Sequence, residues 1–525
     1  MDEESKVIKN ENSKEVLKAY NRIPYSLINA EVNGTTKDTL EELTQICSYY
    51  KVYKEGSSFN VEGSNGDYVP SNLKYKMAAT LINKEARFLF AESPDIVIEP
   101  KGDAGKITEE AKTALTILND LIKTVLDKNL FEQALIKAAK DCFIGKRVAG
   151  LVNFNEEDGV TVTFLPSTQF LYETKEGNKN VLTKFVCFMI IKNSRTLSEK
   201  IIFKKKYELV DGIVYLEEVL YDGAGREIEV ITEYQETLMP VIPASIFVND
   251  GLTAEDDGES EIESLSYKES WYSKLSCSDL DAQRKSMNPT KYVVDMDNNS
   301  TKHLSTAAGA LWDLGTDQNL DSPHPMVGIL EPSMNYSSSL ETTLNRIEKA
   351  AYDELDMPNI DALQATITSG KALKSIYWGL IVRCKEKMKM WSPQLRVLVD
   401  IIIKGAYVYP NCISQYTNDT LMPVDYEIKV TQNLPLPEDE IEEKNMDLSE
   451  VEAGVMSKKS YMKKWRELTD EEAQEELEQI VLERQMIDEA TFKSNNMFGE
   501  EETTIESDTE GTEEETIEEE TIEEV

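Results

Sequence analysis

The sequence predicts an α+β fold in which helices precede and follow a block of short strands. Apolar residues recur at helical spacing on both sides of that block. Inside it, runs rich in β-branched and aromatic residues alternate with turns such as Asp211-Gly212. The expected strands are residues 148–153, 160–172, 181–192, 200–210, 214–221, 227–233 and 245–248. We expect an antiparallel, meandering sheet packed on the preceding helices.

Three helical regions precede the strands. The first covers residues 10–55, where apolar positions keep helical spacing. An amphipathic run follows over residues 73–90, and Ser71 or Asn72 is positioned to cap it. The third region, residues 107–143, again places its apolar residues on one helical face.

The chain after the strands alternates long helices with short extended segments. The expected helices are residues 261–286, 337–355, 369–409, 440–453 and 470–491, and the extended segments are residues 291–296, 327–330 and 426–430. Pro393 removes one hydrogen bond from the helix over 369–409 and is expected to kink or stop it. A basic patch over residues 458–466 separates the last two helices.

The charge balance constrains the partners. The formal net charge is −41, and the last 26 residues hold fourteen acids and no bases, so the rest of the chain is also strongly acidic. A conventional DNA-binding protein neutralises phosphates with Lys and Arg. The strongly acidic composition of this chain therefore argues against that class of protein. A protein that surrounds DNA without gripping it remains compatible with the composition.

Targeting segments and cysteine frameworks are not expected. The most apolar stretch, residues 397–409, carries Asp400 and Lys404, so no membrane span is predicted. The N-terminus is acidic and lacks the pattern of a secretory signal, which favours synthesis and folding in a cytoplasm. The six cysteines are far apart in sequence, so buried thiols are expected in place of a zinc site or disulfides.

No motif in the sequence predicts an enzyme. Gly370-Lys371 suggests a phosphate-binding loop, but alanine stands at the two positions where the motif needs Gly and Ser or Thr. The run from Asp295 to Asn299 begins like a calcium-binding loop and lacks its Gly and its final Glu. Carboxylate clusters are common in a chain with 97 acids and identify no active site. We predict no catalytic residue, no metal and no cofactor.

Four local motifs, in their order and spacing, carry a resemblance to a known family. They are Asn72-Leu73-Lys74 with Phe88-Leu89-Phe90-Ala91-Glu92-Ser93-Pro94, Gly258-Glu259-Ser260-Glu261 with Tyr267, Trp271 and Asn288-Pro289, Ser369-Gly370-Lys371-Ala372-Leu373-Lys374 with Glu386-Lys387, and Gly454-Val455-Met456-Ser457-Lys458 with Asp470-Glu471-Glu472-Ala473. From about Leu73 to about Glu489 the chain resembles the portal proteins of tailed bacteriophages. Within them it is most similar to the large family of long-tailed phages of Gram-positive hosts.

The resemblance implies the phage portal fold, with an α/β wing, a two-helix stem, a small α/β clip, a long kinked tunnel helix and an α-helical crown. The implied boundaries are wing 1–260 with a return strand near 411–436, stem helices 261–287 and 336–356, clip 288–335, tunnel loop 357–368, long kinked helix of the wing 369–410 and crown 437–498. The resemblance assigns no role to the acidic tail, residues 499–525, which is expected to be disordered because it has too little apolar surface to fold alone.

The implied function is a ring at one capsid vertex through which double-stranded DNA is packaged and ejected. The resemblance implies a homo-oligomer, expected to be a dodecamer, that docks the terminase motor. Major capsid and scaffolding proteins and the later head-completion and tail adaptor proteins are the other implied partners, with no membrane. The location implied is the portal vertex of the virion, after assembly in the host cytoplasm.

The resemblance also assigns residues to this function. The DNA-facing tunnel loop would present Asn359, Asp361, Gln364, Thr366 and Thr368. Lys371 and Lys374 lie just beyond that loop, and we expect them to pair with acids of neighbouring subunits in preference to DNA. Further bases follow at Arg383, Lys385, Lys387 and Lys389. The clip segments expected to pair between subunits contain Lys291, Tyr292, Val293, Val294, Val327 and Ile329.

Two other function classes stay open at this point. One is an oligomeric structural scaffold of a phage or prophage that does not handle DNA, which an acidic helical protein with a sheet domain also fits. The other is an acid-dependent hydrolase, although no sequence feature points to its catalytic carboxylate. Rings with an axial hole distinguish a portal from the scaffold.

Overall fold

The computed structural model divides the chain into two compact units, residues 1–437 and 438–525. The residues that it describes are 23–32, 36–60, 69–102, 108–192, 196–251, 257–287, 290–294, 326–330, 334–359, 374–417, 421–435, 440–466 and 468–497.

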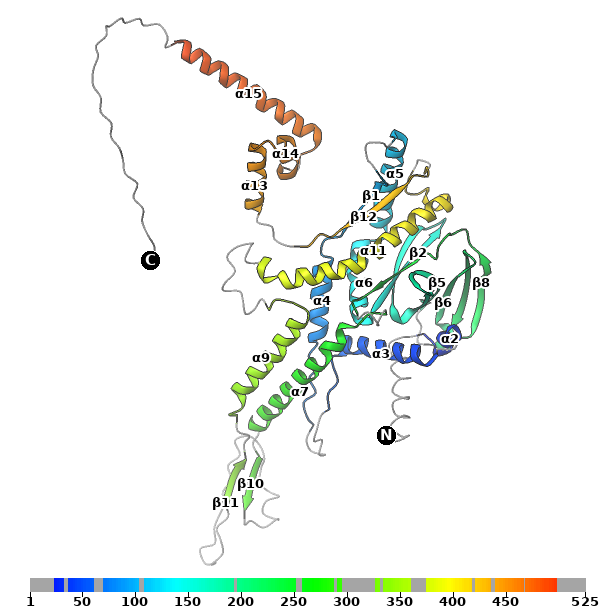
Figure 1. The fold of residues 1–525 in the computed structure, drawn as a ribbon. Helices are drawn as coiled ribbons and strands as arrows, with labels where there is room; N and C mark the ends of the chain where they lie inside the picture. The colour runs from blue at the N-terminus through cyan, green and yellow to red at the C-terminus, as the bar shows by residue number, and fades with distance from the viewer. Residues whose placement is uncertain are drawn as a thin grey trace, which may run out of the picture. The chain divides into compact units, whose positions relative to one another are not determined.

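Figure 1 shows the helices and strands of the first unit. Its helices are α2 (Tyr25–Glu31), α3 (Thr36–Glu55), α4 (Met77–Leu89), α5 (Glu109–Lys128), α6 (Phe131–Gly145), α7 (Glu261–Met287), α9 (Ser337–Glu354), α11 (Trp378–Val408) and α12 (Pro410–Ile413). Its strands are β1 (Asp95–Pro100), β2 (Arg147–Asn155), β3 (Gly159–Pro166), β4 (Phe170–Lys175), β5 (Asn178–Lys192), β6 (Ile201–Val210), β7 (Ile213–Asp222), β8 (Glu227–Glu236), β9 (Ala244–Val248), β10 (Thr290–Val294), β11 (Met326–Leu330) and β12 (Tyr426–Thr431). The α+β class is therefore confirmed.

The strand block forms two sheets where the sequence predicted one. Strands β4 to β8 make a five-stranded antiparallel meander, and β3, β2 and β9 make a separate three-stranded sheet. The predicted single strand over 160–172 is wrong, because a 3-10 turn at Ser167–Gln169 divides it into β3 and β4. Pro166, which has no N–H for the ladder, precedes this turn.

Alternating side chains of the two sheets build a layered body. Phe185 and Cys187 of β5 point into a core shared with β2, β3 and β9. The neighbouring Val186 and Phe188 point to the opposite face, where they pack against α2 and α3. The far face of the three-stranded sheet packs on α6 and α11 in the largest core. Helices, two sheets and further helices therefore follow one another through the body.

Helix α11 is the central helix of the largest core. Trp391 is almost fully buried there, with its ring 5.0 Å from that of Phe90 and 4.7 Å from that of Phe247. The helix runs through Pro393 without ending, because buried residues on both sides of the proline hold it in place. The predicted break is wrong, and a bend at Pro393 stays a prediction. The helix also begins later than expected, after a short helical turn at residues 374–376.

Two further boundaries differ from the predicted ones. The helix expected over 107–143 is two helices, since Leu130 adopts a left-handed conformation between α5 and α6. Helix α4 begins after Lys76, whose side chain does not cap it, so the predicted caps at Ser71 and Asn72 are wrong. All six cysteines are buried free thiols, as expected.

The second unit contains three helices within its described residues. They are α13 (Glu440–Glu452), α14 (Lys458–Arg466) and α15 (Asp470–Met497). The basic patch forms α14, and Asp447 of α13 accepts bonds from Lys464 and Trp465 at 2.8 Å each. Arg466 pairs with Glu476 of α15 at 2.9 Å. The acidic tail lies outside the described residues.

Candidate functional site

The DNA-facing loop predicted over residues 357–368 follows α9 and precedes α11 in the chain. Asp361, Gln364, Thr366, Thr368 and Lys371 lie outside the described residues. Asn359 is half-buried just after α9, and Lys374 is exposed in the turn before α11. The structure therefore describes only the first residues of the loop, 357–359, and the loop's contact with DNA stays a prediction.

The segment that follows α9 lies against the beginning of α11. An ideal Cβ added to Gly379 of α11 would lie 3.2 Å from Cβ of Asp356, which follows α9. This is a tight contact, so glycine permits the close approach. Arg383 also donates to the backbone carbonyl of Glu354 at 3.4 Å. The end of α9 and the beginning of α11 are therefore held in contact with each other.

A buried charge cluster lies at this point, and we call Glu85, Glu261, Arg383 and Lys387 the joint. The Nε of Arg383 donates to Oε1 of Glu85 at 2.7 Å, and its Nη2 donates to Oε1 of Glu261 at 3.1 Å. Lys387 donates to Glu261 and lies 3.5 Å from Oε1 of Glu85. The joint therefore connects α4, α7 and α11 through charge-assisted bonds.

Three of the four joint residues are almost completely shielded from solvent, and the side chain of Arg383 is 23% exposed. Glu85 is 0% exposed, Lys387 4% and Glu261 6%. Lys387 also donates to Oδ1 of Asn249 at 2.8 Å and lies 4.2 Å from the ring centroid of Phe143. Removing one partner of such a cluster leaves an uncompensated buried charge, so these side chains strongly constrain how the three helices meet.

The two acids of the joint have opposite pKa shifts. Burial and the neighbouring Glu261 raise the pKa of Glu85 to about 8, although Lys387 and Arg383 oppose the rise. Burial also acts to raise the pKa of Glu261, but Lys387, the hydrogen bond with Glu85 and Arg383 outweigh it and lower that pKa to about 2. The Oε2 atoms of both acids lack another donor. A proton held on Glu85 and shared with Glu261 accounts for both observations.

The joint changes the interpretation of the predicted basic residues. Arg383 and Lys387 pair with acids of their own chain, so an intersubunit role for these two is not what the structure shows. Lys385 and Lys389 are exposed on the same helix. The sequence did offer a signal for Glu85, because it falls among the buried apolar positions of the α4 stripe.

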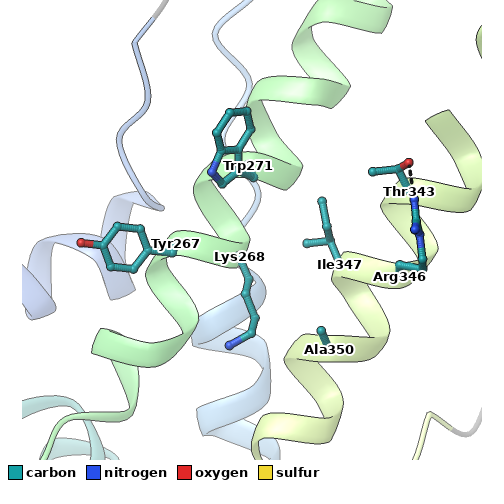
Figure 2. Close-up of a pocket in the computed structure, with 7 residues that line it drawn as sticks. All are labelled: Tyr267, Lys268, Trp271, Thr343, Arg346, Ile347 and Ala350. Atoms are coloured by element: carbon teal, nitrogen blue, oxygen red, sulfur yellow. Dashed lines mark hydrogen bonds between the residues drawn. The ribbon is translucent and has the colours of Figure 1, made fainter.

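Helices α7 and α9, predicted from the sequence to be the paired stem, pack against each other and have bounds close to the predicted ones. Lys268 of α7 pairs with Glu354 of α9 at 2.8 Å, and the Tyr336 hydroxyl donates to Asp279 at 3.1 Å at the other end. Between the helices lies a groove of about 370 Å³. Figure 2 shows its lining of Tyr267, Lys268 and Trp271 from α7 and Thr343, Arg346, Ile347 and Ala350 from α9.

The clip segments form a hairpin within one chain. β10 and β11 pair antiparallel with Tyr292 opposite Gly328 and Val293 opposite Val327. Tyr292, Val327 and Ile329 carry exposed side chains. Each strand has one partner strand among the residues described, so each keeps an outer edge for another chain. The expected pairing between subunits stays a prediction.

The described parts of the chain hold no cluster of three or more His, Cys, Asp or Glu arranged for a metal ion. Within the same parts, no helix has the length and apolar character needed to span a bilayer.

Comparison with known protein families gives a match in the later part of the chain. Residues 290–490 match the family model described as phage portal protein, SPP1 Gp6-like. Over these residues the chain is similar to the phage portal family. The portal match contains the hairpin, α9, α11, β12, α13, α14 and most of α15. It confirms the predicted resemblance over somewhat less than half of the chain. No curated protein matches the chain.

Proposed function

We propose that the chain is the portal protein of a tailed bacteriophage, assembled as a ring at one capsid vertex. Double-stranded DNA passes through the ring during packaging and ejection. The terminase motor docks on it first, and the head-completion and tail adaptor proteins follow. The portal-family match over residues 290–490 carries this proposal.

The stem geometry supports the proposal. The matched segment begins with the hairpin and continues through α9 and α11, and the joint ties α11 to α4 and α7. In the proposed ring, β10 and β11 form the clip, α7 and α9 the stem, and residues 357–368 the loop toward DNA. A dodecamer, capsid and scaffolding contacts, and a virion location belong to the same proposal.

The charge of the chain also suits a conduit. DNA must slide, so each strong contact between a base and a phosphate would have to break as the duplex advances. The net charge of −41 instead favours walls that repel the phosphates on all sides. The proposed pore wall is therefore net negative, with polar contacts from the loop.

Electron microscopy of the purified chain tests the proposal. We expect rings with an axial opening. Filaments or compact dimers would instead favour a structural scaffold that does not handle DNA.

Charge reversal of Lys371 and Lys374 then tests their expected role. Loss of ring assembly would support pairing with neighbouring subunits. Intact rings that fail only in packaging would place these lysines next to DNA. The same reversal at Lys389, an exposed lysine farther along α11, is the matched control and is expected to leave both assembly and packaging intact.

A further inference from the structure

Four buried or half-buried polar side chains form a stripe along α7, at intervals of four residues. They are Glu269, Ser273, Cys277 and Asp281. The stripe faces residues 69–76, which run before α4 without helix or strand structure and which we call the strap. Four residues of a helix rise about 6 Å and two residues of an extended chain span about 6.6 Å. A stripe with this spacing can therefore bind every second amide of an extended segment.

The central bonds of the strap follow this spacing. Ser273 Oγ accepts the amide of Tyr75 at 3.1 Å. One helical turn later, Cys277 Sγ accepts the amide of Leu73 at 3.1 Å and lies 3.3 Å from the Leu73 carbonyl, to which it donates. Side chains of α7 therefore bind the strap through its main chain, and the strap runs antiparallel to α7.

The outer end of the strap continues the pattern. The two carboxylate oxygens of Asp281 accept the amide of Ser71 at 3.0 and 3.2 Å. Arg284 then donates to the Val69 carbonyl at 3.3 Å. Every second residue from Tyr75 to Val69 thus contacts a side chain of α7.

Glu269 fixes the inner end of the strap. Its Oε1 accepts the amide of Ser57 at 2.6 Å, and its Oε2 accepts the amide of Ala78 at 2.8 Å. Ala78 lies in the first turn of α4, so Glu269 supplies the cap that Lys76 does not provide. Gly56 has a φ of +81°, and a Cβ there would lie 2.9 Å from Cβ of Lys74.

Hydrogen bonds hold the strap, whereas its apolar side chains are poorly buried. Val69 is 78% exposed, Leu73 48% and Tyr75 37%. Segments that bury little apolar surface have low local stability, so they open before the core unfolds. By contrast, α4 places most of its apolar residues in the largest core, and the beginning of α7 places Ile262 and Leu265 there.

We propose that the strap is a latch that detaches from α7 as one unit while α4 and α7 stay folded, and that its docking holds the distal half of α7. The inference rests on the proposed function, in which α7 is a stem helix whose attachment to the body matters to the ring. The latch itself can be measured without rings or DNA, so failure of the latch and failure of the portal proposal remain distinguishable.

The native thiol of Cys277 reports on the latch, because the thiol lies behind Leu73 and is 3% exposed. The full chain is pulsed with N-ethylmaleimide, and labelling at each cysteine is read from peptide masses. Cys187, which is fully buried between the sheets, reports global unfolding. We expect Cys277 to label faster than Cys187 in the unchanged protein.

Glu269→Gln and Asp281→Ala weaken the two ends of the latch separately. Each is expected to raise the Cys277 labelling rate at least tenfold while the Cys187 rate stays constant. Asp281→Ala keeps the test decisive if Glu269→Gln does not fold. The matched control is Glu263→Gln on the same helix, since Glu263 accepts from the Tyr49 hydroxyl at 2.7 Å and is not part of the stripe. An unchanged Cys277 rate in Asp281→Ala, or a rise only together with Cys187, would overturn the latch.

Discussion

The beginning of α7, which lies in the body built around the largest core, and the distal half of the same helix, beyond Ser273, are stabilised by different interactions. At the beginning of α7, Ile262 and Leu265 are buried in the largest core, next to the joint. Beyond Ser273 the buried face of the same helix contains Ser276 and Cys277, and polar bonds to the strap and to α9 dominate. One continuous helix is thus embedded at one end and tethered at the other. The buried beginning of α7 therefore contributes to the stability of the fold, whereas the tethered distal half of the same helix can adjust its position.

The largest effect is expected in the body. Trp391→Ala removes the side chain that packs between Phe90 and Phe247, and it leaves a cavity in the central core. We expect the free energy of unfolding to fall by roughly 3 to 5 kcal/mol. Denaturant titration measures this change. If the free energy of unfolding fell only as much as it does for the substitution of an exposed residue, the body would not be stabilised by its apolar core in the way that distinguishes it from the distal half of α7.

The joint should give the next largest effect. Lys387→Met leaves Glu261 buried and only partly compensated by Arg383, so we expect a loss of about 3 kcal/mol in the free energy of unfolding. Lys404→Met on the same helix is the control. Its partner Asp400 is one turn away and half-exposed, so breaking that pair should cost less than about 1 kcal/mol. Equal losses in the two variants would contradict the structural importance of the joint.

The pH dependence of stability tests the shared proton. Glu85 binds its proton more tightly in the folded chain, so its contribution is complete below pH 4.5 and is lost as the pH rises toward 8. Glu261 has the opposite shift, and its contribution is complete above pH 4.5 and is lost as the pH falls toward 2.

Glu85→Gln should therefore remove the loss of stability that the unchanged protein shows as the pH rises toward 8. Between pH 5 and pH 8 the unchanged protein should lose roughly 3 kcal/mol of stability relative to this variant. Urea titrations across the pH range measure the difference. Parallel profiles for the two proteins would show that Glu85 carries no proton in the joint.

The smallest effect on stability is expected at the hairpin. Ile329 is 57% exposed, so Ile329→Ser should change the free energy of unfolding of one chain by less than about 0.5 kcal/mol. In the proposed ring the same change should weaken contacts between subunits. Sedimentation of the assembled protein measures that loss, and unchanged assembly would show that the hairpin edge is not used between subunits.

Elements with strong local patterns could be predicted from the sequence. Both stem helices lie within a residue or two of their predicted bounds, since apolar spacing and a following Asn288-Pro289 or Pro358 mark them. The meander β4 to β8 follows from alternation and turn residues. Its separation from β2, β3 and β9 could not be predicted, because only tertiary packing decides which strands share a sheet.

The joint and the strap depend on contacts that are distant in sequence. Glu85 meets Arg383 across nearly three hundred positions, and local periodicity does not encode such a pairing. The stripe of Glu269, Ser273, Cys277 and Asp281 was visible as four-residue spacing, but its target is a main chain and leaves no side-chain pattern in residues 69–76. Pro393 failed as a helix breaker because burial in the core outweighs the lost hydrogen bond.

The mass of the native oligomer tests the central claim most directly. A portal ring predicts one closed species whose mass is a fixed multiple of the 59.5 kDa chain, with a dodecamer as the expected assembly. Native mass spectrometry of the full chain under assembly conditions gives this number. A chain that stays monomeric under those conditions would contradict the ring and, with it, the passage of DNA through this protein.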